Sequence, residues 1–234
     1  MLSAVIVPLV QVATLLAMLA PAQSAAAAGA VTLDGVRVHL RQGTTQVVTV
    51  NHTSGYYARV SLWSLVDGHW TCVLHTTDGR IGYGGLVAGA KRVQNTGTTP
   101  LGTYRLLGSF GTHPRKPRWH LRYRKIKPGD YWVGDNASRY YNRYRNKAKG
   151  GFRWRLPADD ANGSEHLADY PVQYEYAINT GFNRQQVRHR GSAIFLHVNG
   201  SGSTAGCVSV PRWFMRSLFV RLRPARHPEI AIGR

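Results

Sequence analysis

The apolar and polar residues of this chain alternate mainly with the period of β-strands. Short runs rich in Val, Ile, Thr and Tyr are separated by turn signals such as Asp67-Gly68 and Asp78-Gly79. The runs predict strands at 46–51, 58–66, 70–76, 103–110, 131–133, 172–179, 192–198 and 229–232. So many short strands predict a mainly β fold, and a β-sandwich is the arrangement that buries their apolar faces.

One helix is predicted near the C-terminal end of the chain. It begins at Pro211, because proline suits the first helical turn, and it extends to Leu222. Apolar side chains recur there at helical spacing, at Trp213, Phe214, Leu218 and Leu222. Residues 112–170 lack clear periodicity, which predicts a long insertion or lid of short turns. We therefore expect a β-sandwich with one buttressing helix and a capping segment.

The N-terminal segment has the pattern of a secretory signal peptide. The first thirty residues contain no Lys, Arg, Asp or Glu, and residues 5–20 are largely apolar. Small residues at 25–28 offer cleavage sites, so we predict a signal peptide at 1–28, with cleavage near Ala27, and a single domain at 29–234. A retained membrane anchor is the alternative. Pro8 and Gln11 interrupt the apolar run, however, and a span needs about 20 apolar residues.

The charge of the chain is strongly positive and unevenly spread. The net charge is +19, and residues 91–156 hold 17 of the 30 Lys and Arg residues but only two acids. Aromatic residues are interleaved with these cations. In a cytosolic protein this pattern would indicate nucleic-acid binding, but a secreted protein meets peptidoglycan and anionic cell-wall polymers instead. We expect those partners and no nucleic acid; the alternative is a solvated basic surface.

Residues 192–211 carry the most specific chemistry. A strand ending in His197 is followed by a Gly-, Ser- and Thr-rich loop and then by Gly206-Cys207. This order returns a thiol toward an imidazole, as in a Cys/His nucleophile site. A thiol with an ordinary pKa of about 8.5 needs a base. We predict Cys207 as nucleophile and His197 as general base and later acid. Gly206 would let its own N–H, or that of Cys207, face a developing oxyanion.

Further candidates have more ordinary interpretations beside the functional ones. Thr204 or Ser203 could orient the imidazole, and either could equally be a loop residue. Tyr174 or Tyr176, on the strand that precedes the His197 strand, could line the pocket, although such tyrosines often only pack. Asn199 could contact substrate.

Metal, cofactor and disulfide chemistry receive little support from the sequence. No His or Cys spacing fits a metal site and no cofactor motif is present, so we expect neither group. Ser164-Glu165-His166 is interpreted as a polar loop. A Cys72–Cys207 disulfide would be possible in a secreted chain. We favour two free thiols instead, with Cys72 buried on a strand and inert.

Several segments together resemble a known family. The stretch from His197 to Gly206-Cys207 resembles the signature of the YkuD-type L,D-transpeptidases. Residues 97–104, with the sequence Gly-Thr-Thr-Pro-Leu-Gly-Thr-Tyr, and residues 108–111 resemble a second conserved segment of that family. The resemblance covers most of residues 45–234. Ala205 stands where the usual motif has a second His, which indicates a divergent branch.

The resemblance implies the same β-sandwich fold and a particular reaction. Cys207 would attack the peptide bond between the third residue of a peptidoglycan stem tetrapeptide and its terminal D-Ala. The thioester would then be resolved by an amine of a neighbouring stem, which forms a 3→3 cross-link. Two alternatives stay open: an L,D-carboxypeptidase that uses water as the acceptor, and a non-catalytic basic cell-wall-binding protein.

Overall fold

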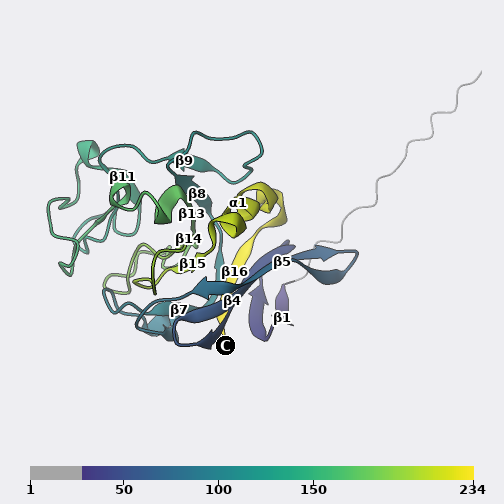
Figure 1. Cartoon of the computed structure of the whole chain (residues 1–234). Helices are drawn as coiled ribbons and strands as arrows, with labels where there is room; N and C mark the ends of the chain where they lie inside the picture. The colour runs from purple at the N-terminus through teal and green to yellow at the C-terminus, as the bar shows by residue number, and fades with distance from the viewer. Residues whose placement is uncertain (1–27) are drawn as a thin grey trace, which may run out of the picture.

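A computed structural model describes residues 28–234 of the chain (Figure 1). The predicted signal peptide and its cleavage site near Ala27 lie outside the described residues, apart from residue 28. Within 28–234, no helix combines the length and the apolar character needed to cross a membrane. The described residues are mainly β, with one α-helix, so the predicted fold class is confirmed.

Sixteen strands, one α-helix and five 3₁₀ turns make up the described part of the chain. The strands are β1 (Gly29–Leu33), β2 (Val36–Leu40), β3 (Gln46–Ser54), β4 (Tyr57–Val66), β5 (His69–Arg80), β6 (Leu86–Ala88), β7 (Thr99–Arg105), β8 (Gly108–Gly111), β9 (Tyr123–Lys125), β10 (Asp130–Trp132), β11 (Tyr144–Asn146), β12 (Glu165–His166), β13 (Tyr176–Asn179), β14 (Phe195–Val198), β15 (Val208–Val210) and β16 (Glu229–Gly233). The helices are η1 (Gly89–Lys91), η2 (Lys147–Lys149), η3 (Leu167–Asp169), η4 (Gln173–Glu175), α1 (Arg212–Arg221) and η5 (Pro224–Arg226).

Eleven strands form the main sheet, in the order β6-β7-β16-β3-β4-β5-β15-β14-β13-β8-β9. The parallel pair β14 and β15 lies near its middle, joined by the loop between His197 and Cys207. Apolar side chains from β3 and β4 share one core cluster with side chains from β13, β14 and α1. The two halves of the sheet therefore meet over a common core, with α1 beside it (Figure 1).

Side-chain alternation along β14 divides the interior into two clusters. Leu196 and Val198 point into the core that α1 covers. Phe195 points to the other face, where Trp132 and Phe110 pack against it. His197 shares the face of Phe195, because successive residues of a strand alternate. The buttressing helix and the site thus lie on opposite faces of the same strand.

Residues 126–170 are built around a small sheet rather than around turns alone. The strands β11, β10 and β12 pair in that order. Trp132 on β10 anchors this sheet, because its ring packs 4.8 Å from the ring of Phe195. These strands have only two or three residues, which explains why the sequence shows no periodicity there.

Three predicted elements have different boundaries in the structure. The strand expected at 103–110 is two strands, β7 and β8, because the chain crosses from β16 to β13 between them. The N–H of Leu106 donates to Pro228 O and that of Leu107 to Asn179 O, at 3.0 and 3.1 Å. The strand expected at 172–179 begins only at Tyr176, after η4. The strand expected at 192–198 begins at Phe195, since Ala193 has φ 55°.

The predicted helix is confirmed as α1, with a small shift at its start. Pro211 has φ −53° and ψ 147°, so it precedes the helix instead of occupying its first turn. The buried side chains of α1 are Phe214, Met215, Leu218 and Phe219, which face the main core.

Candidate active site

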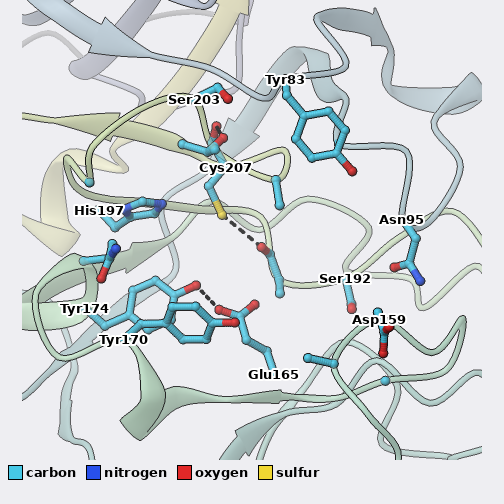
Figure 2. Close-up of a pocket in the computed structure, with 18 of the residues that line it drawn as sticks. Tyr83, Asn95, Asp159, Glu165, Tyr170, Tyr174, Ser192, His197, Ser203 and Cys207 are labelled. Carbon is cyan, nitrogen blue, oxygen red and sulfur yellow. Dashed lines mark hydrogen bonds between the residues drawn. The ribbon is translucent and has the colours of Figure 1, made fainter.

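One cavity, of about 520 Å³, lies where β14 and the loop 199–207 face the segment 158–174 (Figure 2). Side chains from five parts of the chain meet there. Its lining residues are Tyr83, Arg92, Gln94, Asn95, Gly97, Ala158, Asp159, Gly163, Glu165, Tyr170, Gln173, Tyr174, Ser192, Ala193, His197, Gly200, Ser201, Gly202, Ser203, Thr204, Ala205 and Cys207. The cavity therefore contains both His197 and Cys207.

His197 is held at the end of β14 in one defined tautomer. Its side chain is buried, and Nδ1 lies 2.8 Å from the carbonyl oxygen of Val198. A carbonyl can only accept, so Nδ1 carries the proton and Nε2 is left with a free lone pair. Burial lowers the pKa of His197 to about 4, although the Val198 carbonyl opposes the shift. The imidazole is thus neutral at pH 7 and able to accept a proton.

Cys207 is a buried thiol with two backbone contacts. Its Sγ donates to the carbonyl oxygen of Ala193 at 3.1 Å and accepts from the N–H of Phe195 at 3.3 Å. Burial raises the pKa of Cys207 to about 12, and the carboxyl of Glu165 adds to the shift. The Phe195 N–H and Arg92 oppose it. No hydrogen bond joins Cys207 to His197 in the described part of the chain, so the resting pair is a neutral thiol and a neutral imidazole.

The turn before Cys207 is closed by Thr204. Its hydroxyl accepts from the N–H of Gly206 at 3.2 Å and donates to the carbonyl oxygen of Cys207 at 2.7 Å. Thr204 therefore closes the turn before Cys207, and no contact joins it to the imidazole of His197 within residues 28–234. The Gly206 N–H already has an acceptor, whereas the N–H of Cys207 has none within residues 28–234 and is free to donate to a ligand.

Gly206 is required by the space around the turn. It has φ 123°, a conformation that side chains rarely adopt. A Cβ on this residue would lie 2.8 Å from both the Nη2 of Arg92 and the carbonyl oxygen of Thr98. Close approach of Arg92 and of the residue just before β7 thus explains the glycine beside Cys207.

Thr99 fixes the turn before Cys207 to β7, a role that sequence reasoning missed. Its buried hydroxyl accepts from the N–H of Gly82 at 2.8 Å and donates to the carbonyl oxygen of Gly206 at 2.9 Å. The Thr-Pro-Leu-Gly segment was the sequence signal for this contact. It pointed to this part of the chain but did not show why the threonine is needed.

Thr99→Val is expected to lower the free energy of unfolding by about 1–3 kcal/mol, because it leaves a buried N–H and a carbonyl unpaired. Chemical denaturation measures this loss. Thr98→Val is the matched control, since the hydroxyl of Thr98 pairs with that of Thr96 at the surface. Equal stability of the two variants would contradict the anchoring role of Thr99.

Arg92 is buried beside the turn that precedes Cys207. Its Nε donates to the carbonyl oxygen of Thr98 at 2.7 Å and its Nη1 to that of Arg190 at 3.1 Å. Burial lowers the pKa of Arg92, with Cys207 opposing. The sequence placed this residue in the basic segment, yet it is the only Lys or Arg that lines the cavity. A buried cation here favours the thiolate form of Cys207.

Glu165, Tyr170 and Tyr174 form the wall facing the Cys/His pair (Figure 2). The hydroxyl of Tyr174 donates to Glu165 Oε1, and its ring lies 5.5 Å from that of His197. Burial raises the pKa of Glu165 to about 7, against the effect of the Tyr174 hydroxyl. The polar loop inferred for residues 164–166 is therefore part of the cavity wall.

Of the other predicted site residues, some line the cavity and others do not. Tyr174 lines the cavity from η4, and Ser203 lies at its exposed rim. Tyr176 does not reach it, because its side chain points to the α1 face of β13 and packs 5.1 Å from the ring of Phe219. Asn199 is also outside the lining and donates to Asp78 O at 2.9 Å. Neither Tyr176 nor Asn199 lines the cavity, so its geometry gives no support for a role of either side chain in substrate binding.

Both cysteines are free thiols, as predicted. Cys72 is exposed on β5, however, so the prediction that it is buried is wrong. The residues of β5 around Cys72 are mostly exposed, so this part of the strand lies outside the core. Within residues 28–234, no group of three or more His, Cys, Asp or Glu side chains could hold a metal ion.

The aromatic rings of the basic segment 91–156 contact the protein's own cations and core. Arg145 lies over the ring of Tyr140 at 3.4 Å, and Lys147 lies over that of Trp154 at 4.8 Å. Six more of its rings are buried, those of Phe110, Trp119, Tyr131, Trp132, Tyr141 and Phe152. The interleaving of aromatic and basic residues is thus explained by intramolecular packing.

A buried thiol and a neutral imidazole thus line one cavity on a mainly β domain, and these are the two groups that thiol nucleophile chemistry requires. Residues 62–230 match the sequence model of the YkuD L,D-transpeptidase catalytic domain, so the chain belongs to this family. No curated protein matches the chain significantly.

Among solved structures, the chain is similar to the helical cell shape determining protein Pgp2 (K307A mutant) from Campylobacter jejuni. The two are 15% identical with a TM-score of 0.40, over 81% of this chain and 47% of that chain. The chain therefore spans about half the length of that protein.

Proposed function

We propose that this protein is an extracytoplasmic L,D-transpeptidase that acts on peptidoglycan stem peptides. Membership of the L,D-transpeptidase catalytic domain family supports the reaction class and the substrate. The observation that carries the proposal is the meeting of Cys207 and His197 in one cavity, with Nδ1 of His197 tied to the Val198 carbonyl. That contact leaves Nε2 to exchange protons with the thiol and the substrate.

The first half-reaction forms a thioester. Nε2 of His197 takes the thiol proton as Sγ of Cys207 attacks the carbonyl carbon of the third stem residue. The resulting oxyanion faces the N–H of Cys207, and Arg92 adds positive charge close by. His197 then returns the proton to the nitrogen of the leaving D-Ala, and the acyl group stays on Cys207.

The second half-reaction releases the acyl group to an amine. A deprotonated amine of a neighbouring stem attacks the thioester carbonyl, an amide bond forms, and the Cys207 thiolate recovers its proton through His197. The product is a 3→3 cross-link. Water in place of the amine would make the protein an L,D-carboxypeptidase through the same intermediate.

Intact-mass measurement with a stem tetrapeptide or a carbapenem tests this function. We expect a covalent adduct on native protein, and with the tetrapeptide its mass should show the loss of D-Ala. Analysis of the products from disaccharide-tetrapeptide substrate then separates cross-linked dimer from trimmed tripeptide. A protein that binds wall material but never forms an adduct would favour the non-catalytic alternative.

The positive surface is proposed to concentrate anionic wall polymers near the enzyme. The apparent KM for polymeric wall substrate should rise with ionic strength, because this attraction is screened over about 10 Å in 0.1 M salt. The kcat for a small neutral donor should barely change. Replacing four exposed lysines with Gln, at Lys116, Lys125, Lys127 and Lys149, should flatten the salt dependence. If the salt dependence were unchanged in that variant, these four lysines would not attract wall polymers and would only be exposed to solvent.

A further inference from the structure

Glu165 is unusual among the acids of this protein. The chain has 11 Asp and Glu residues against 30 Lys and Arg. Six of the acids form ion pairs with Arg or His side chains: Asp34, Asp78, Asp135, Asp169, Glu175 and Glu229. Glu165 has no basic partner in the described part of the chain, although it is partly buried and faces a cavity.

The surroundings of Glu165 leave one oxygen available to a ligand. Oε1 accepts from the hydroxyl of Tyr174, whereas Oε2 has no hydrogen-bond partner within residues 28–234. Arg92, the one Lys or Arg that lines the cavity, donates instead to the carbonyl oxygens of Thr98 and Arg190. Within residues 28–234, Glu165 therefore has no cationic side chain as a partner.

Two tyrosine rings stand beside this carboxylate. The rings of Tyr170 and Tyr174 have centroids 5.3 Å apart and are inclined at 53°. Tyr174 contacts the carboxylate through its hydroxyl, so an ammonium group bound at the other oxygen would gain an ion pair and would lie beside the two rings, where a cation–π contact can add to it. The net charge of the protein gives a carboxylate in the cavity a specific use. A net charge of +19 repels cationic substrate groups, and a nearby carboxylate offsets that repulsion.

We propose that Glu165, with Tyr170 and Tyr174, forms a subsite that binds a primary ammonium group of the stem peptide. This inference rests on the proposed function, which brings stem peptides into the cavity. A diamino acid at the third stem position supplies such a group. It belongs either to the donor stem, as its side-chain amine, or to the acceptor stem, as the amine that resolves the thioester.

Burial keeps the pKa of Glu165 at about 7 in the free protein. A bound ammonium group would favour the ionised carboxylate and lower that pKa. A bound ammonium group thus supplies the positive partner that Glu165 lacks in the free protein. It would lie close to both Cys207 and His197 (Figure 2).

Binding to a Cys207→Ala protein tests the subsite without turnover. The probes are L-Ala-γ-D-Glu-L-Lys-D-Ala and the same peptide acetylated on the lysine Nζ, with calorimetry as the readout. We expect the free amine to bind about 10- to 100-fold more tightly than the acetylated peptide. Adding Glu165→Gln should remove this difference, whereas adding Asp169→Asn should keep it. Asp169 is an exposed acid of the same segment that contacts His166 and does not line the cavity.

Kinetics on otherwise native protein identify which stem supplies the amine. If the donor does, Glu165→Gln lowers acylation by the free-amine peptide about 10- to 100-fold and leaves the acetylated peptide unchanged. If the acceptor does, acylation is unchanged. In that case Glu165→Gln changes how the thioester is resolved: a smaller share reacts with added amine and a larger share with water.

Several results would overturn the subsite. They are equal binding of the two peptides to the Cys207→Ala protein, equal losses for both peptides in Glu165→Gln, and no kinetic effect in either half-reaction. Melting curves of Glu165→Gln establish that the variant is folded. If native protein formed no adduct while binding still depended on the free amine and on Glu165, the proposed function would fail and the subsite would stand.

Discussion

Replacing Cys207 with alanine is expected to abolish acyl-enzyme formation while the fold stays intact. The only attacking atom in the proposed mechanism is Sγ, and its loss should lower turnover by on the order of 10³-fold or more. The thiol is buried and its partners are two backbone groups, of Ala193 and Phe195. Removing it leaves a small cavity that costs on the order of 1 kcal/mol of stability.

Intact-mass and product measurements on the folded variant check this prediction. The matched control is Cys72→Ala, because Cys72 is the other free thiol and lies exposed on β5. That variant should form the adduct at the native rate. An adduct on Cys207→Ala, or its loss in Cys72→Ala, would assign the nucleophile elsewhere.

Elements rich in apolar residues could be predicted from the sequence. The strands β3, β4 and β16 and the helix α1 carry clusters of apolar residues, and most of these residues are buried in the structure. The short strands β9, β11 and β12 could not be predicted. They have two or three residues, partly charged, and are held by pairing with β8 and β10.

The residues of the candidate site likewise fall into those that the sequence could predict and those that it could not. His197 and Cys207 are close in the sequence and framed by a strand and a glycine turn, so local pattern sufficed to pair them. Glu165 and Arg92 come from segments without periodicity, where a charged residue is normally solvated. Tertiary contacts bring the first of these segments over the cavity, among them the packing of Trp132 against Phe195 and the hydrogen bond from Gln94 to Ala161 O. These contacts link distant parts of the chain, and no local pattern encodes them.

Tyr176 shows why an apolar strand does not by itself place a side chain in a pocket. Tyr174 and Tyr176 would share a face if both lay on one extended strand. The 3₁₀ turn η4 ends at Glu175 and breaks that relation. Tyr174 consequently faces the cavity, while Tyr176 faces α1.

Replacing His197 with glutamine is expected to lower the rate of acylation by on the order of 10²-fold or more, as for loss of a general base. The pKa values predict a second and more specific effect. In native protein the pKa of His197 is about 4 and that of Cys207 about 12. For a donor that carries no free side-chain amine for Glu165 to bind, the rate should therefore rise as the imidazole loses its proton near pH 4 and stay level through neutral pH.

Without His197 the reaction depends on the thiolate alone. Because burial raises the pKa of Cys207 to about 12, the thiolate fraction grows about tenfold for each pH unit between pH 6 and 9. Stopped-flow acylation rates of His197→Gln should follow that slope, while those of native protein stay flat. His113→Gln is the control, since that imidazole pairs with Glu175 and packs against Tyr176, away from the cavity. A flat profile in His197→Gln, or a rate within about threefold of native, would show that another group takes the thiol proton.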